Sequence, residues 1–205
     1  MRTIAKTLGR AALLSLLCTG AAHAQFGNPG GMLPDTAEAR PGLPAPGQAN
    51  VQDRLFIKLL GMGNAGEMEA GRLADARASN QAVKAFARKM VEDHGAAARK
   101  LSAAARPLDV VVPLEPDPDQ KAARARLEAL EGQAFDVAYL DAQLVDHQKA
   151  VTLLEWVISN GQDAGIQAFA KETLFQVQGH LLHVQALRAD VMPNGPEGAT
   201  VGQKR

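Results

Sequence analysis

Four long amphipathic segments dominate the sequence and constrain its fold more than any other feature. In each segment the apolar residues recur every three or four positions, the period of an α-helix with one buried face. Asn80 separates the first two segments, and Asn160-Gly161 separates the last two. Because helices with one apolar stripe must bury it against each other, the pattern predicts an all-α bundle. The expected helices are 51–79, 80–105, 133–160 and 163–190.

The connection between the second and third helices is long, and the two hairpins that it joins are weakly similar. It is rich in proline and contains a short expected helix at 119–131. The segment 67–80 can be aligned with 147–160, and slightly later 83–87 (VKAFA) aligns with 166–170 (IQAFA). Two similar hairpins joined by a long crossover predict a ferritin-like four-helix bundle.

The N-terminus has the features of a bacterial Sec-type signal peptide. Three basic residues precede an apolar stretch at 11–22, which is too short to span a bilayer. The sequence AHA at 22–24 is a small-x-small cleavage site. We therefore expect a signal peptide at 1–24, cleavage between Ala24 and Gln25, and a periplasmic or secreted mature protein.

Segments rich in glycine and proline flank the helical region. They predict a disordered linker at 25–50 and a disordered tail at 192–205, on either side of one folded domain at 51–191. Cys18 is the only cysteine, so the mature chain would have no disulfide. Lipoprotein processing at Cys18 is the less favoured alternative, because Leu17 stands where such sites carry a small residue.

The charge balance argues against nucleic acid as a partner. The chain has 22 basic and 22 acidic residues, and loss of Arg2, Lys6 and Arg10 with the signal peptide leaves 19 against 22, a net charge of −3. Binding to phosphates requires a basic surface. No second apolar run is long enough for a transmembrane helix in the mature chain. A second copy of the chain or a cell-envelope protein is the expected kind of partner.

Several polar residues interrupt the apolar stripes near the middle of the helices. Glu67 lies before the turn at Asn80, and His94 lies almost equally far after it. His147 lies as far before Asn160 as Glu67 lies before Asn80. At 1.5 Å per residue each is about 20 Å from its turn, so we expect all three in one layer. His180 lies about one turn away from that layer. Glu69 is the alternative to Glu67, but the repeat aligns Glu67 with His147 and favours Glu67.

This layer has the chemistry of a transition-metal site. Imidazole and carboxylate groups suit iron, zinc, manganese or copper. Asp93 and Asp146, each adjacent to a histidine, are candidates to support the ligands from outside. Asp136 and Tyr139 are expected either to pair by a hydrogen bond or to cap the helix at 133–160. The candidate ligands are Glu67, His94, His147 and His180.

A structural hydrogen-bond network is the alternative interpretation of the same layer. Neutral histidines pair with Glu, Asp or Tyr across a bundle core and fix the helix register. Ferritin-like di-iron sites use Glu-x-x-His, which this sequence lacks, since Val91, Leu144 and Val177 stand three residues before the histidines. His183 falls off its stripe and is expected at the surface.

The sequence therefore favours a non-enzymatic role over catalysis. It has no P-loop, no dinucleotide-binding motif and no Ser-His-Asp arrangement, so hydrolases and nucleotide-using enzymes have no support. The first interpretation is an exported bundle that binds a metal. The second is an interaction or stress-protective module of the cell envelope, and the third is a metal-dependent redox enzyme.

Four stretches within residues 55–188 carry a family resemblance. They are Glu-x-x-x-Gly-x-Leu-Ala at 67–74, VKAFARKMVEDH at 83–94, GQAFDVAYLDAQLVDH at 132–147, and the segment at 171–181. In these stretches the chain resembles the secreted bacterial family known as domain of unknown function 4142. Phe175 stands where that family usually has proline. The resemblance implies a ferritin-like helical bundle, and it implies no activity because none is established for the family.

Overall fold

The computed structural model describes residues 49–192, and all regular secondary structure in that range is helical. The prediction of an all-α fold is therefore confirmed. The predicted signal peptide at 1–24, the linker before Ala49 and the tail after Met192 lie outside the described residues. The elements are α1 (Val51–Arg77), α2 (Gln81–Ala105), the 3-10 turn η2 (Arg106–Leu108), α3 (Pro118–Glu128), α4 (Gly132–Asn160) and α5 (Ala164–Val191).

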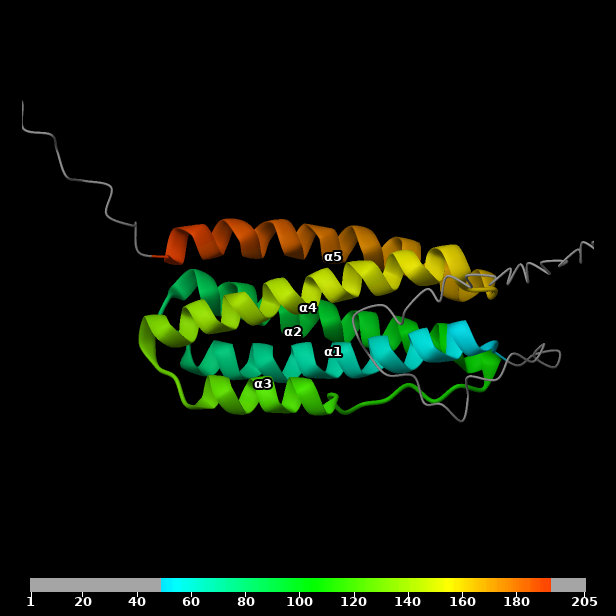
Figure 1. Ribbon diagram of the computed structural model, residues 1–205, viewed down its shortest axis with the longest axis horizontal. Helices are drawn as coiled ribbons and strands as arrows, with labels where there is room; N and C mark the ends of the chain where they lie inside the picture. Colours follow the sequence, from blue (N-terminus) through cyan, green and yellow to red (C-terminus); the bar gives the residue numbers. More distant parts are fainter. Residues whose placement is uncertain (1–48, 193–205) are drawn as a thin grey trace, which may run out of the picture.

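The four long helices run side by side, and the shorter α3 lies along the outside of the bundle (Figure 1). Helix α1 packs mainly against α2, and α4 packs mainly against α5. The two pairs meet through the contacts of α1 with α4 and of α2 with α5. After α2, the chain returns along the full length of the bundle before α4 begins (Figure 1). This arrangement is consistent with two hairpins joined by a long crossover.

Side-chain caps mark the starts of α1, α2, α3 and α5. The side chain of Asn50 accepts a hydrogen bond from the backbone of α1, and those of Asn80 and Asp163 do the same for α2 and α5. Asp117 and Gln120 form a reciprocal capping box at α3, which also has proline in its first turn. Such caps satisfy backbone N–H groups that have no partner within the helix. The expected boundaries therefore agree with the structure to within a few residues.

Two buried aspartates tie the hairpins together at opposite ends of the bundle. Asp53 on α1 accepts hydrogen bonds from the backbone N–H groups of the α4–α5 turn at 162–163. Asp136 on α4 accepts hydrogen bonds from the α1–α2 turn at 79–80. Asp53 and Asp136 are separated by a fixed number of residues. The same number separates the caps Asn80 and Asp163, and the segments 83–87 and 166–170. One constant shift therefore relates the two hairpins over their whole length.

This shift corrects two expectations from the sequence. The alignment that paired Glu67 with His147 is wrong by about one helical turn, and the residue equivalent to His147 is Asn64. A shift of one turn keeps the same helix face inward, which is why the apolar stripes did not reveal the error. The expected pair of Asp136 and Tyr139 is also wrong. Asp136 is bonded to the α1–α2 turn, and the Tyr139 hydroxyl has no hydrogen-bond partner among the described residues.

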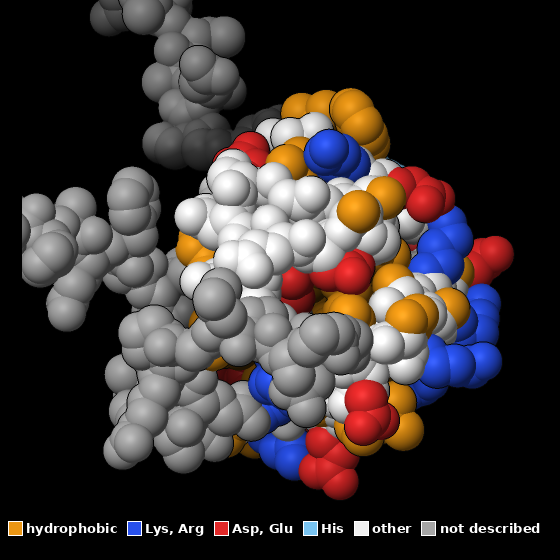
Figure 2. Space-filling view, turned by 90° about the vertical axis from the view of Figure 1, so that its right-hand side faces the viewer, with side chains coloured by type: hydrophobic (Ala, Val, Ile, Leu, Met, Phe, Trp, Pro, Cys, Tyr) orange, Lys and Arg blue, Asp and Glu red, His pale blue; other side chains and the backbone are white. Residues whose placement is uncertain are grey.

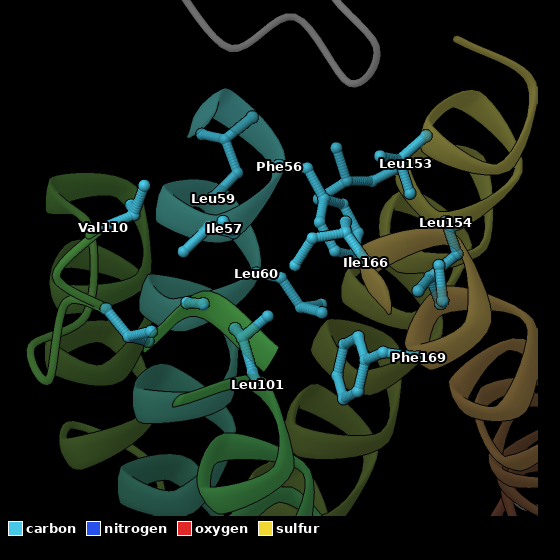
Figure 3. Packing of buried hydrophobic residues seen from close by; sticks show 14 of the residues in the cluster. Phe56, Ile57, Leu59, Leu60, Leu101, Val110, Leu153, Leu154, Ile166 and Phe169 are labelled. Atoms are coloured by element: carbon cyan, nitrogen blue, oxygen red, sulfur yellow. The ribbon is translucent and has the colours of Figure 1, made fainter. Parts of the chain in front are cut away.

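The apolar core is divided into two clusters along the bundle. The first lies near the α4–α5 turn, where Phe56 and Phe169 meet edge to face (Figure 3). The second lies near the α1–α2 turn and includes Phe86, Phe135 and Tyr139. A layer of buried polar residues separates the two clusters. The members of this layer are Asn64, Glu67, His94, Gln143, His147 and His180.

Two glycines of α1 are expected to respond in opposite ways to substitution by alanine. A Cβ at Gly71 would lie 2.8 Å from Val91 Cγ2 and 3.0 Å from the carbonyl oxygen of Ala87, so α1 and α2 would have to separate. We expect Gly71→Ala to lower the free energy of unfolding by about 1–3 kcal/mol. A Cβ at Gly63 meets nothing within 4 Å, so Gly63→Ala should raise it by about 0.4–1 kcal/mol. Urea unfolding of both variants checks this, and equal effects would contradict the close approach at Gly71.

The described surface carries charges of both signs. At the end of the bundle shown in Figure 2, Lys and Arg side chains gather along one edge, with acidic side chains beside them. Phe175 is 77% exposed on α5. Within residues 49–192, no helix combines the length and the hydropathy that are needed to cross a bilayer.

Candidate metal centre

Three imidazole rings meet in the middle of the bundle. His94 comes from α2, His147 from α4 and His180 from α5, and all three side chains are buried. One ring nitrogen of each lies within 4.8 Å of the corresponding nitrogens of the other two. The distance from His147 Nε2 to His180 Nδ1 is 3.4 Å. Two imidazole ligands of a tetrahedral zinc ion are about 3.3 Å apart, so this pair already has a ligand-like spacing.

The outward-facing nitrogen of each ring is held by a hydrogen-bond acceptor. His94 Nδ1 lies 3.0 Å from Asn64 Oδ1, and His147 Nδ1 lies 2.9 Å from the carbonyl oxygen of Gln143. His180 Nε2 lies 2.7 Å from Asp93 Oδ2. In a neutral imidazole one nitrogen donates and the other accepts, so these three acceptors place the protons on the outer nitrogens. The inner nitrogens then direct three lone pairs toward one another.

Burial keeps the three rings neutral. Loss of solvent lowers the pKa of His147 to about 4, and the nearby His180 contributes to the same shift. Burial also lowers the pKa of His94 well below its usual value, and it lowers that of His180 despite the opposing effect of Asp93. Neutral imidazole is the form that binds metal ions. Three convergent lone pairs without a proton between them repel one another, and a bound cation removes that repulsion.

Glu67 lies in the same layer but on the other side of the His147 ring. Its Oε1 is 3.8 Å from His147 Nδ1, the nitrogen that faces away from the other two histidines. Its Oε2 accepts a hydrogen bond of 2.5 Å from Gln143 Nε2. Burial, together with the charge of Asp146, raises the pKa of Glu67 to about 8, and the Gln143 hydrogen bond opposes both. The group of converging ligand atoms therefore contains three histidines and not Glu67.

Of the two aspartates expected to support the ligands, only Asp93 contacts a ring. It directly precedes His94 in the sequence, yet it binds His180 across the bundle, because neighbouring residues on a helix point about 100° apart. Burial opposes ionisation of Asp93, but hydrogen bonds from Lys89, His180 and Gln176 outweigh it and lower its pKa. Asp146 pairs with Lys149 at 3.5 Å. It acts on the layer through the pKa of Glu67.

Two residues of the site were not expected from the sequence. Asn64 holds the ring of His94, and Gln143 holds His147 through its backbone and Glu67 through its side chain. Gln143 lies one helical turn before His147 on the same helix face, so the helical period could have identified it. The constant shift between the hairpins would have identified Asn64 as the counterpart of His147. His183 is exposed, as expected, and its ring lies against Phe86.

A cavity of about 550 Å³ reaches the three histidines from the side of α3. Small residues line much of it, among them Gly63, Ala97 and Ala150. Asn64 and Glu67 of α1 also face this cavity. Its volume lies in the range of about 300–1,000 Å³ that is typical of small-molecule sites. The layer is therefore accessible to ions and small molecules on this side.

Structural comparison shows similarity to two solved helical proteins. A DUF305 fragment from Deinococcus radiodurans is 14% identical, with a TM-score of 0.63, over 70% of this chain and 99% of the fragment. A DUF305 protein from Streptomyces coelicolor, inferred to be secreted, is 13% identical, with a TM-score of 0.60, over 68% of this chain and 92% of that protein. At these identities the similarity supports the fold alone.

Sequence comparison confirms the family resemblance. No curated protein matches the chain significantly. The family described as domain of unknown function DUF4142 matches residues 38–187, which include nearly all of the helical bundle and every residue of the polar layer. The chain belongs to the DUF4142 family.

Proposed function

We propose that this protein is an exported helical bundle that binds one transition-metal ion through His94, His147 and His180. The observation that carries the proposal is the convergence of three neutral imidazoles whose outer nitrogens are all held by acceptors. Metal-binding histidines typically have such a partner on the second nitrogen, because it fixes the tautomer and the orientation of the ring. Export is supported by the signal-peptide features and by the similarity to a protein inferred to be secreted.

The donor set favours zinc or copper over manganese. Three imidazoles without a converging carboxylate suit zinc and copper, whereas manganese prefers oxygen ligands. Iron also accepts imidazole, but its non-haem sites usually include a carboxylate. Glu67, the glutamate of this layer, lies on the outer side of the His147 ring.

A structural network is the second candidate, and one contact favours it. If His180 carried two protons, its Nδ1–H would donate to His147 Nε2 at 3.4 Å while its Nε2–H donates to Asp93. The histidines would then form a buried polar network in an interaction module of the cell envelope.

Thermal unfolding with and without metal separates the two candidates. Protein stripped with a chelator should gain stability from Zn²⁺ or Cu²⁺, by about 2.7 kcal/mol when the free metal is at 100 times its dissociation constant. The gain should saturate at one ion per chain. A structural network predicts no gain from either ion, because a ligand stabilises only a folded state that it binds.

Asp93 and Asp146 provide a matched pair of variants. We expect Asp93→Ala to weaken Zn²⁺ binding by about 10- to 100-fold, because His180 loses the acceptor that holds its Nε2–H. Asp146→Ala should leave the affinity nearly unchanged, since Asp146 pairs with Lys149 and not with a histidine. Competition with a chromophoric chelator measures both affinities. Equal losses in the two variants would point to a general effect of charge and contradict the role of Asp93.

A further inference from the structure

Helix α5 carries no charged residue over its central half, on either face. Residues 173–187 include no Lys, Arg, Asp or Glu. The inner face of this stretch packs in the bundle, whereas Phe175 and Leu182 on the outer face are 77% and 69% exposed. These two side chains are seven residues apart and therefore lie on one stripe of the helix. A helix that is apolar on all sides is typically buried on all sides, which indicates that a partner covers the outer stripe.

The uncharged surface continues onto the neighbouring edge of α4. Leu144 of α4 and Leu181 of α5 are both partly buried against one core cluster, and Val151 and Leu174 are partly buried against the other. Gln148, which lies between Leu144 and Val151, is exposed and uncharged. These five residues, with Phe175 and Leu182, form the α4–α5 face.

Charged residues border the α4–α5 face at both ends. At one end Asp141 of α4 forms an ion pair with Arg188 of α5. Helices α4 and α5 are antiparallel (Figure 1), and Glu155 follows Asp141 by 14 residues, so Glu155 lies level with residue 174, about one turn from Lys171. Fourteen residues are also almost four whole turns, which places both acids on the same edge of α4. The acidic groups of this face are thus on α4, and its basic groups are on α5.

The other acidic residues beside the α5 stripe point away from the α4–α5 face. Glu172 forms an ion pair with Lys100 of α2, so it lies on the side of α5 that faces α2. Asp190 follows Glu172 by 18 residues, which is five whole turns, and therefore lies on the same side. These two carboxylates leave the charge pattern of the α4–α5 face unchanged.

This charge pattern selects one way in which two copies of the face can pair. A two-fold axis parallel to the helices places α4 of each copy against α5 of the other at the same level. Asp141 then faces Arg188 of the second copy, and Glu155 faces its Lys171. A two-fold axis perpendicular to the helices instead places α4 on α4 and α5 on α5, with acid against acid and base against base. Opposite charges across an interface fix its register and exclude wrong arrangements, so the charges favour the parallel pairing.

We propose that the α4–α5 face binds a second copy of this chain, in a two-fold dimer whose axis runs parallel to the helices. The dimer buries Phe175 and Leu182, and it does not depend on the proposed metal site. A membrane surface fits the face less well. Helices that lie on membranes carry Lys and Arg along their polar side, whereas Asp141 and Glu155 border this face and would repel anionic lipids.

Sedimentation velocity of the exported protein over a wide range of concentrations tests this inference. We expect a reversible dimer that Leu182→Glu weakens by about 100-fold or more, because each dimer would bury two unpaired carboxylates. Leu114→Glu is the matched control, since Leu114 is 81% exposed on the connection between α2 and α3, away from this face (Figure 1). It should leave the dimer unchanged, and circular dichroism should show the same helical content in both variants. A protein that stays monomeric at every concentration, or equal losses in both variants, would overturn the proposal.

An exchange of charges tests the arrangement of the two copies. Glu155→Lys should weaken the dimer by about 3- to 30-fold, because two basic groups would then face each other, and adding Lys171→Glu to the same chain should restore most of the affinity. The perpendicular axis predicts the reverse, a tighter dimer in Glu155→Lys, because this position would then face Asp141. That result would overturn the parallel pairing. Binding to phosphatidylglycerol vesicles that Leu182→Glu abolishes would assign the face to a membrane and overturn the dimer.

Discussion

Replacement of His147 by alanine is expected to lower the affinity for Zn²⁺ by more than about 100-fold, since loss of an outer partner of a metal ligand alone costs about 10- to 100-fold. His147 Nε2 lies 3.4 Å from His180 Nδ1, and the ring is held rigidly by the carbonyl oxygen of Gln143. Glu67 is on the wrong side of the ring to replace it without moving. The affinity is measured by competition with a chromophoric chelator.

His183→Ala is the matched control for this loss. His183 lies on α5, one turn after His180, but it is exposed and its ring packs against Phe86. Removing it should leave Zn²⁺ affinity unchanged. Far-ultraviolet circular dichroism should show that both variants keep the helical fold. Wild-type affinity in His147→Ala, or an equal loss in His183→Ala, would contradict a site built from the three buried histidines.

Deprotonation of Glu67 is expected to lower the stability of the metal-free protein as the pH rises from 6.5 to 8. The pKa of Glu67 is about 8 in the folded protein, whereas its ordinary value is 4.5. Between these values the folded state binds more protons at Glu67 than the unfolded state does, so stability falls with rising pH. One proton corresponds to a slope of about 1.4 kcal/mol per pH unit, or roughly 2 kcal/mol over this interval.

The histidines produce the opposite slope at lower pH. Their pKa values are depressed in the folded protein, to about 4 for His147 against an ordinary value of 6.5. Between these values the unfolded state binds more protons, so their contribution to stability is lost as the pH falls below 6.5. At pH 6.5 each unfolded histidine is still about half protonated, so the three together raise the stability by roughly 1 kcal/mol between pH 6.5 and 8. Comparison with a variant that lacks the Glu67 carboxyl therefore isolates Glu67.

Glu67→Gln tests the origin of the alkaline loss. The amide cannot ionise, so the loss due to Glu67 should disappear and the free energy of unfolding should rise slightly between pH 6.5 and 8 as the unfolded histidines lose their protons. Glu69→Gln is the control, because Glu69 is only partly buried and pairs with Arg124 at 2.8 Å. Glu69→Gln should show the same dependence of the free energy of unfolding on pH as the unsubstituted protein. Urea unfolding at several pH values measures all three proteins, and a fall in stability with rising pH that persists in Glu67→Gln would contradict the role of Glu67.

Much of the fold follows from local rules that the sequence displays. The period of the apolar residues identified four long helices, and Asn80 and Asp163 begin α2 and α5 because their side chains cap the backbone. Counting residues from each turn placed His94 and His147 at mid-height, since the rise per residue is constant along a helix. The burial of Glu67 in preference to Glu69 is confirmed, although the alignment that favoured it was one turn out of register.

The contacts between the polar side chains could not be obtained in this way. Whether Asp93 meets His94 or His180 depends on how two helices face each other, and sequence adjacency favoured the wrong histidine. His180 joins the other rings although it lies one turn beyond their layer. Helical side chains lean toward the N-terminus of their helix, so its ring reaches back along α5. The position of Glu67 behind His147 likewise depends on the packing of α1 against α4.

X-ray absorption spectroscopy of the Zn²⁺-loaded protein tests the central claim most directly. The three-histidine site predicts one Zn²⁺ per chain, with scattering from three imidazole rings at about 2.0–2.1 Å and one further light ligand. Loss of one imidazole contribution in His147→Ala would complete the agreement. Failure to bind Zn²⁺ or Cu²⁺ stoichiometrically after reconstitution, or a bound ion whose spectrum contains no imidazole scattering, would contradict it.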